Sequence, residues 1–323
     1  MKTKLSAALM LLLTSIVWGF AFVAQVKGSN HVDTFTFNGA RFILGGLSLV
    51  PVTIIFSLAE RSRKRKNLIA ASEAISEASP AMSGKDRAKK AVIASLVCGV
   101  ILFIASALQQ YGAQITQSAG RSGFITGSYT VWVPVFYWLI FKKKVSLNTW
   151  VGMVVAMSGL ALLCLKGDET QAISFGEVLL FVGVFFWAAH ILAIDYFVRD
   201  INPLIFSMSQ FLVCGIINAI LAIIFEAPTL EALGQAKWFI LYCGLLSVGV
   251  GYTFQILGQK HCDPTFAAII FSTESVFSAL GGAIFGVDHL SVTGYIGCAI
   301  VFVGIVIAQL DFSKIFRHKV QKV

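Results

Sequence analysis

Residues 145–160, VSLNTWVGMVVAMSGL, resemble residues 290–305, LSVTGYIGCAIVFVGI, which lie 145 positions later in the chain. The two stretches share their apolar pattern, and aromatic and glycine residues fall on one another: Trp150 on Tyr295, Gly152 on Gly297 and Gly159 on Gly304. A unit that recurs at a fixed spacing indicates a chain built from two copies of one substructure. The sequence therefore predicts two related halves.

A second alignment, at an offset of 169 residues, joins the beginnings of the halves. It places IVWGFAFVAQ (16–25) on FFWAAHILAI (185–194), with Trp18 on Trp187, and continues to put Arg41 on Gln210. Because the N-terminal segment recurs inside the chain, we interpret it as a first helix and not as a signal peptide. The difference between the offsets predicts an insertion, the basic linker at about 60–90, and hence two repeats, residues 1–165 and 166–323.

The composition is that of a membrane protein. Hydrophobic residues make up 57% of the 323 residues, charged residues 13%, and the mean hydropathy is +0.82. Apolar runs close to the length that crosses a bilayer recur along nearly the whole chain, which leaves no room for a separate soluble domain. We expect an all-α integral membrane protein with ten transmembrane helices, at roughly 5–26, 36–58, 90–110, 118–140, 146–165, 174–196, 203–225, 236–257, 264–286 and 291–310.

Charge decides the expected orientation. Most of the 25 Lys and Arg fall in segments that lie on one side if both termini are cytoplasmic, whereas Lys27, Lys166 and Lys237 fall on the other. The net charge of +9 then reflects topology and contact between basic loops and the anionic inner leaflet, and nucleic-acid binding is not expected. We expect a multi-pass protein of the plasma (inner) membrane, either a monomer or a homodimer.

Five helices per repeat have a consequence for the fold. An odd number of crossings makes the second copy start on the opposite side, so the two five-helix repeats are inverted. Inverted repeats are a recurring basis of secondary transporters, which bind solute near the midplane between the halves. The repeat does not identify the solute.

Several motifs resemble one known family. They are WG at Trp18, ARFILGG around Arg41, RSGFITGSYTVWVPVF (121–136), and AAIIFSTESVFSALGGAIFG (267–286) with the helix after it. Together they make the chain similar to EamA-type members of the drug/metabolite transporter superfamily. The resemblance implies a ten-helix carrier that moves amino acids, related metabolites or drugs outward without ATP. The sequence departs from the family pattern at Ser275, where the family has proline after the glutamate, and at Lys144 and Asp288-His289, where an acidic residue is usual.

Helical periodicity sorts the polar residues inside the expected spans onto faces. Tyr129 and Glu274 align at the 145-residue offset, so both are expected to face one cavity. The candidate substrate-binding residues of this central cavity are Trp18, Arg41, Ser122, Thr126, Tyr129, Trp187, His190, Gln255 and Glu274. No cofactor, metal site or disulfide framework is expected from the six cysteines, because no CxxC pair occurs.

Some residues keep two interpretations. Arg41 is suited to a substrate carboxylate, but it could also be a structural partner of Glu274 or reach the outer interface. His190 and Glu274 are candidates for proton coupling, and His190 could instead be a neutral histidine bonded to a neighbouring helix. We expect Arg121 to snorkel toward the interface and Pro134 to kink its helix.

The leading hypothesis is a secondary transporter that exports a small organic solute by alternating access, with possible proton coupling. An uncoupled facilitator is the alternative. An intramembrane enzyme lacks support, since no HExxH motif, P-loop or evident nucleophile accompanies the buried histidine and carboxylate. A non-transporting scaffold is disfavoured by the inverted repeat.

Overall fold

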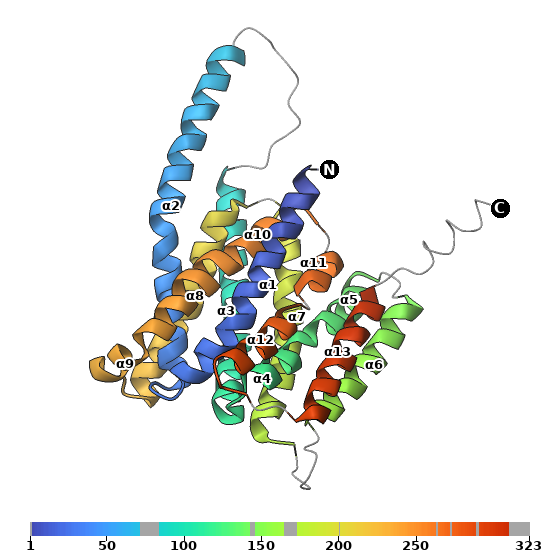
Figure 1. Cartoon of the computed structure of the whole chain (residues 1–323). Helices are drawn as coiled ribbons and strands as arrows, with labels where there is room; N and C mark the ends of the chain where they lie inside the picture. Colours follow the sequence, from blue (N-terminus) through green and yellow to red (C-terminus); the bar gives the residue numbers. More distant parts are fainter. Residues whose placement is uncertain are drawn as a thin grey trace, which may run out of the picture.

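The computed structural model describes residues 2–71, 84–142, 146–164, 173–199, 201–262, 264–271, 273–288 and 291–309. Every regular element within these ranges is a helix, and the helices form one bundle (Figure 1). In the first half they are α1 Lys2–Gly28, α2 Thr34–Ala71, α3 Gly84–Thr116, α4 Ala119–Gly127, α5 Tyr129–Phe141 and α6 Leu147–Cys164. In the second half they are α7 Phe175–Phe197, α8 Pro203–Phe225, α9 Leu230–Leu241, η1 Tyr242–Tyr252, α10 Thr253–Gln259, α11 Pro264–Phe271, α12 Thr273–Ile284 and α13 Val292–Gln309.

Seven helical stretches among the described residues are long and apolar enough to cross a membrane. They are Leu5–Gly28, Thr34–Phe56, Ala88–Thr116, Ala119–Phe141, Phe175–Phe197, Pro203–Phe225 and Leu230–Gln259. Two shorter apolar helices, Trp150–Leu162 and Val292–Gly304, lie within α6 and α13, and the span expected at 264–286 is divided between α11 and α12. The chain is therefore a multi-pass, all-helical membrane protein.

The helix expected at 36–58 is longer than its apolar part. α2 continues to Ala71 and projects beyond the bundle (Figure 1), so the expected linker begins as helix. Residues 57–71 contain neither proline nor glycine and are rich in strong helix formers, which favours this continuation. The rest of the expected linker, up to the start of α3 at Gly84, lies outside the described residues.

The helix expected at 118–140 breaks at Ser128, not at Pro134. The Ser128 N–H and hydroxyl both donate to the carbonyl of Ile125, at 3.2 and 2.7 Å, which tightens the last turn of α4. Serine competes in this way with regular helical bonding. Pro134 lies inside α5. The break separates Thr126 and Tyr129, two residues expected in the cavity.

The helix expected at 236–257 contains a π-helix, η1, of 11 residues. Its wider turn leaves carbonyl groups accessible to α1. There the Trp18 Nε1–H donates to Ser247 O at 3.2 Å and the Thr14 hydroxyl donates to Gly251 O at 3.0 Å. Single-turn π segments are frequent at functional sites, and this one is much longer.

Close helix contacts depend on small residues. α1 packs against α12, η1 and α10, while α2 pairs with α8, α3 with α7 and α6 with α13. A Cβ on Gly19 of α1 would overlap Phe277 of α12, and one on Gly304 of α13 would overlap the backbone of Ala156 in α6. α1 begins and α13 ends at the same end of the bundle (Figure 1), which is called the inner end below.

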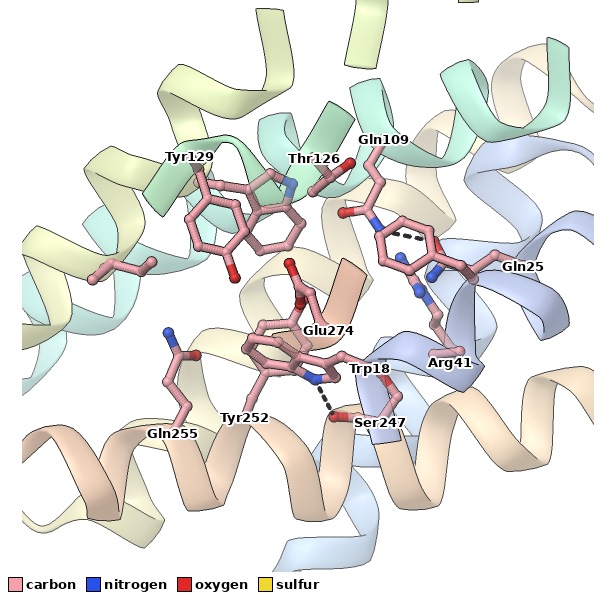
Figure 2. Close-up of a pocket in the computed structure, with 14 residues that line it drawn as sticks. Trp18, Gln25, Arg41, Gln109, Thr126, Tyr129, Ser247, Tyr252, Gln255 and Glu274 are labelled. Carbon is pink, nitrogen blue, oxygen red and sulfur yellow. Dashed lines mark hydrogen bonds between the residues drawn. The ribbon is translucent and has the colours of Figure 1, made fainter. Parts of the chain in front are cut away.

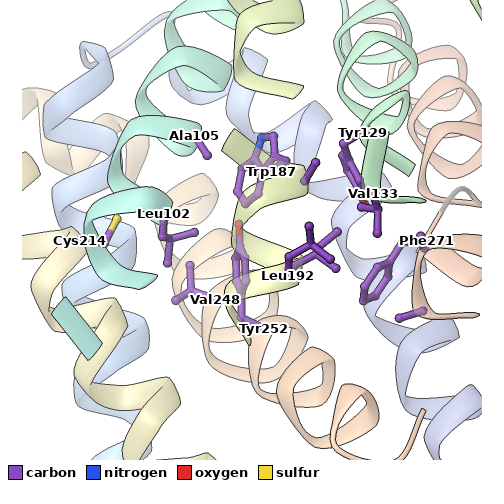
Figure 3. Packing of buried hydrophobic residues seen from close by; sticks show 14 of the residues in the cluster. Leu102, Ala105, Tyr129, Val133, Trp187, Leu192, Cys214, Val248, Tyr252 and Phe271 are labelled. Carbon is purple, nitrogen blue, oxygen red and sulfur yellow. The ribbon is translucent and has the colours of Figure 1, made fainter. Parts of the chain in front are cut away.

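The largest buried cluster lies where the two halves meet. Figure 3 shows Tyr129, Trp187, Tyr252 and Phe271 approaching one another from α5, α7, η1 and α11. Since these side chains come from both halves of the chain, the same interface that packs the bundle also forms the walls of the candidate site.

Candidate functional site

A cavity lies in the middle of the bundle, between helices of both halves (Figure 2). Its walls combine aromatic rings with a few amides and two ionisable groups. The lining residues are Trp18, Ala21, Phe22, Gln25, Arg41, Gln109, Thr126, Tyr129, Trp187, Ile191, Ser247, Tyr252, Gln255 and Glu274. Of the candidates from the sequence, Trp18, Arg41, Thr126, Tyr129, Trp187, Gln255 and Glu274 are among them, whereas Ser122 and His190 are not.

Arg41 brings a positive charge to this cavity. It lies two turns into α2, its side chain is only 3% exposed, and its Nε has no hydrogen-bond partner. The guanidinium lies over the rings of Phe37 and Phe42, at 5.6 and 5.0 Å from their centroids. None of the ion pairs among the described residues includes it. Because a buried charge without a counter-ion is costly, the arrangement fits an anionic group that enters the cavity.

Glu274 brings a carboxyl group to the same cavity from the first turn of α12. It is 3% exposed, and its Oε1 has no hydrogen-bond partner. Figure 2 shows the carboxyl pointing toward the hydroxyl of Tyr129, its counterpart in the repeat. Arg41 and Glu274 thus line one cavity without pairing with each other, and the structural pair considered for them is absent from the described residues.

Ser275 follows Glu274 where the related family has proline, and it fixes the position of the carboxyl group. Its hydroxyl donates to the carbonyl of Gly123 at 3.1 Å, which ties α12 to α4. A Cβ at Gly127 would overlap the Ser275 hydroxyl. The glycine therefore lets the two helices approach closely beside the cavity.

The aromatic wall is centred on Tyr252. Its ring lies 4.6 Å from Trp18 and 6.2 Å from Trp187, measured between centroids, and is nearly parallel to Trp187. The two tryptophans that align in the repeat therefore flank one tyrosine. The Trp187 Nε1 has no partner, whereas that of Trp18 is bonded to η1. Only Trp187 thus has an indole N–H to offer a solute.

Comparison with known proteins gives the family. The EamA-like transporter family profile matches residues 5–165 and 174–309. The chain belongs to the EamA-like transporter family. It is 23% identical to an uncharacterized transporter of Archaeoglobus fulgidus over 95% of this chain and 87% of that protein. It is 22% identical to the uncharacterized transporter YoaV of Bacillus subtilis, over 93% and 95% of the two chains.

A solved crystal structure described as that of a protein shares the fold of this EamA-like transporter. The TM-score is 0.66 at 15% sequence identity, and the match covers 94% of this chain and 96% of the other. At this identity the likeness concerns the fold alone.

His190 lies behind the cavity wall in this EamA-like transporter. It is fully buried, its Nε2 lies 3.1 Å from Gln210 Oε1, and its Nδ1 has no partner. Its ring meets those of Trp187 and Tyr252 edge-on, and both of these line the cavity. The bond to Gln210 of α8 matches the alternative in which His190 bonds a neighbouring helix.

Two polar residues of α4 do not line the cavity. Ser122 is fully buried, and its hydroxyl has no partner. The expectation that Arg121 snorkels is wrong, because Arg121 forms an ion pair with Glu177 of α7. Glu177 also accepts a hydrogen bond from the Ser174 N–H at 3.0 Å in the capping box of α7. The capping box thus holds the carboxylate in place where it pairs with Arg121.

Four polar lining residues were not among the candidate substrate-binding residues. The helical period places Gln25 on one face with Trp18, and the sequence offers Gln109 and Tyr252 as candidate gate contacts near the ends of their helices. Ser247 and Tyr252 lie in η1, whose spacing differs from the α-helical period. Metal binding has no support in the described part of the chain, where no three His, Cys, Asp or Glu gather.

Proposed function

We propose that this EamA-like transporter is a secondary transporter that exports a small organic solute across the plasma membrane by alternating access. The observation that carries the proposal is the central cavity, in which Arg41 and Glu274 lie buried and without ion-pair partners. Opposite charges left apart in one cavity are complementary to a solute that carries both.

The lining indicates the chemistry of the solute. Arg41 can hold a carboxylate by two parallel hydrogen bonds, and Glu274 suits an amine or a proton. Trp187 and Tyr252 offer aromatic surface to an apolar part of the solute. The proposed cargo is therefore a zwitterionic, partly apolar molecule, such as an amino acid or a related metabolite.

The proposed topology consists of ten transmembrane helices in two inverted repeats, residues 1–165 and 166–323. The internal alignments support it, and so does the bundle, in which α1 begins and α13 ends at the same end. The excess of Lys and Arg supports cytoplasmic termini, with the basic run at 61–66 near anionic lipid headgroups. The oligomer is proposed to be a monomer or a homodimer.

Glu274 is the proposed proton-coupling group, and His190 is the secondary candidate. A carboxyl group in a cavity that opens alternately to the two sides can carry a proton in exchange for solute. An uncoupled facilitator needs no such group, so the two mechanisms differ in whether a pH gradient drives accumulation.

A metabolite-release comparison between overexpressing and null cells identifies the solute, and proteoliposomes then measure its flux. We expect an imposed pH gradient to accumulate solute with the native protein but not with Glu274→Gln, which should still exchange solute. Ser278→Ala, a change of another buried polar residue on α12, is the matched control. Equal pH-driven accumulation by Glu274→Gln would exclude coupling through this residue, and the absence of flux of any released solute would refute transport.

A further inference from the structure

Both ends of the cavity are bridged by glutamine side chains. At the outer end, the Gln109 Nε2 donates to Gln25 Oε1 at 3.1 Å, and the Gln110 Nε2 donates to the Gln25 carbonyl at 3.2 Å. These bonds join α3 to α1 and define the outer latch. Gln25 and Gln109 line the cavity themselves, and Figure 2 draws their bond beside Arg41.

At the inner end, the Gln259 Nε2 donates to the carbonyl of Ile191 at 3.2 Å. This bond joins α10 to α7 and defines the inner latch. Ile191 lines the cavity, and so does Gln255, which lies one turn before Gln259 on the same helical face. Figure 1 places α10 toward the end of the bundle where α1 begins. The two latches thus close opposite ends of one cavity.

The repeat relates the two latches to each other. At the 145-residue offset Gln110 falls on Gln255, and Gln114 falls on Gln259. At the 169-residue offset Phe22 falls on Ile191, and both line the cavity. In each half, a glutamine from the third helix of the repeat donates to a backbone carbonyl of the first. The two latches therefore join the same pair of helices in each repeat by the same kind of bond, although the bonded glutamines differ by one turn, since Gln110 falls on Gln255 and Gln259 falls on Gln114.

The latch glutamines are buried yet only partly bonded. Gln25, Gln109, Gln110 and Gln259 are between 0% and 7% exposed, and the Oε1 atoms of Gln110 and Gln259 have no partner. The Nε2 of such an amide donates one hydrogen bond to the neighbouring helix while its Oε1 accepts none. The two helices are therefore joined by a contact that can be broken. Interhelical hydrogen bonds in membranes are worth only about 0.6 kcal/mol each, so each latch can break within a transport cycle.

We propose that these two latches are the outer and inner gates of the transport cycle, and that each one specifically holds its own end of the cavity closed. The inference rests on the proposed function, because a gate has meaning only for a cavity that opens alternately. It assigns a gating role to Gln110 and Gln259, which do not line the cavity, together with Gln25 and Gln109, which do. Breaking one latch should favour the state open to that side only.

Accessibility of a cavity cysteine tests the gates without any solute. Thr126 lines the cavity and its hydroxyl has no partner, so Thr126→Cys is a mild change. It is introduced into the full chain with its six native cysteines replaced by alanine. The probe is a membrane-impermeant methanethiosulfonate, applied to right-side-out and inside-out vesicles, and the labelling rate is measured from each side.

The double variant Gln109→Leu with Gln110→Leu loses two latch bonds. We expect labelling from the outer side to rise about eightfold, because two interhelical bonds of about 0.6 kcal/mol each are lost, and labelling from the inner side not to rise. Gln259→Leu loses one bond and should raise labelling from the inner side only, by about threefold. If a leucine variant does not reach the membrane, methionine at the same position keeps the length but removes the donor.

Gln114→Leu is the matched control. Gln114 is a glutamine of α3 that accepts from Thr34 and donates to Asp33, so its loss also removes two bonds, but it does not line the cavity. It should change neither rate. The proposal is overturned if the latch variants leave both rates unchanged, raise both alike, or match Gln114→Leu. If the latch variants change the labelling rates as expected but no solute flux is measured, the proposed transport function is refuted and the gating of the cavity is not.

Discussion

At the scale of single residues, the charge of Arg41 has no ion-pair partner in the described part of the chain, which indicates a role in function and not in stability. A buried arginine that served the fold would be expected to have a carboxylate or several carbonyl partners. Within the described residues Arg41 has aromatic rings and the Cys243 thiol beside it but no carboxylate partner, while Arg121 has Glu177. The two arginines should therefore respond in opposite ways to removal of their charge.

We predict that Arg41→Met leaves the melting temperature of the detergent-solubilised protein unchanged or raises it, because an apolar side chain replaces an uncompensated charge. The same variant should lose at least about tenfold in transport of a carboxylate-bearing solute, the scale of one lost charge-assisted contact. Arg41→Lys should restore transport only partly, since lysine cannot bind a carboxylate by two parallel bonds. A melting temperature that falls with full transport would assign Arg41 to the fold.

Arg121→Met supplies the contrast. It leaves the Glu177 carboxylate buried without its partner, which typically costs about 3 to 5 kcal/mol. We expect a clear fall in the melting temperature and little change in the apparent affinity for solute. A thermal unfolding series on the two arginine variants and the native protein measures this difference directly.

At the scale of elements, helix pairs are held by glycines and η1 is held by α1. α6 and α13 can approach because Gly159 and Gly304 carry no Cβ, and a methyl group at either would meet the facing backbone. η1 depends instead on two side chains of α1, Thr14 and Trp18, which bind the carbonyls that its wide turns expose. Packing and hydrogen bonding thus act at different places in the bundle.

We predict that Gly304→Ala destabilises the protein by about 1 to 3 kcal/mol, the usual cost of overpacking. Gly234→Ala is the control, because a Cβ there meets nothing within 4 Å and alanine favours helix. It should be neutral or slightly stabilising. Equal melting temperatures for the two alanine variants would contradict the packing assigned to α6 and α13.

We predict that Trp18→Phe disturbs η1 whereas Trp187→Phe does not. The first change removes the donor to Ser247 O, so hydrogen exchange of the amides in 242–252 should accelerate. The second removes an N–H that has no protein partner, so exchange should stay unchanged while the apparent Michaelis constant for solute rises. Hydrogen–deuterium exchange mass spectrometry of both variants distinguishes the two roles.

At the scale of the whole molecule, the proposed topology rests on the charge distribution and on the odd number of helices expected in each repeat. The charge distribution bears on orientation because Lys and Arg are retained on the cytoplasmic side of a membrane. α2 extends from the inner end of the bundle and carries the basic run at 61–66 beyond its apolar part.

We predict that both termini lie in the cytoplasm and that residues 165–172 lie on the outer side. A fluorescent protein fused after residue 323 should be bright, and alkaline phosphatase inserted in 165–172 should be active, because the two reporters work only inside and outside, respectively. Phosphatase inserted within 72–83 should be inactive. The reverse pattern would overturn the proposed orientation and, with it, the assignment of outer and inner latches.

The amino-acid sequence by itself determined the membrane class, the repeat, the approximate positions of the helices and much of the cavity lining. These depend on local properties, namely apolar length, helical period and the alignment of one half with the other. Trp18, Trp187, Tyr129 and Glu274 could be placed together because repeat-related positions on helical faces meet at the interface between the halves.

Only the tertiary structure decided which polar groups bond to one another. The partner of Arg121, the separation of Arg41 from Glu274, and the place of His190 behind Tyr252 depend on helix rotation and depth. The π-register of η1, which brings Ser247 and Tyr252 to the cavity, is invisible to an α-helical period. Contacts between helices far apart in sequence are fixed by side-chain packing across the whole bundle, and no local pattern encodes them.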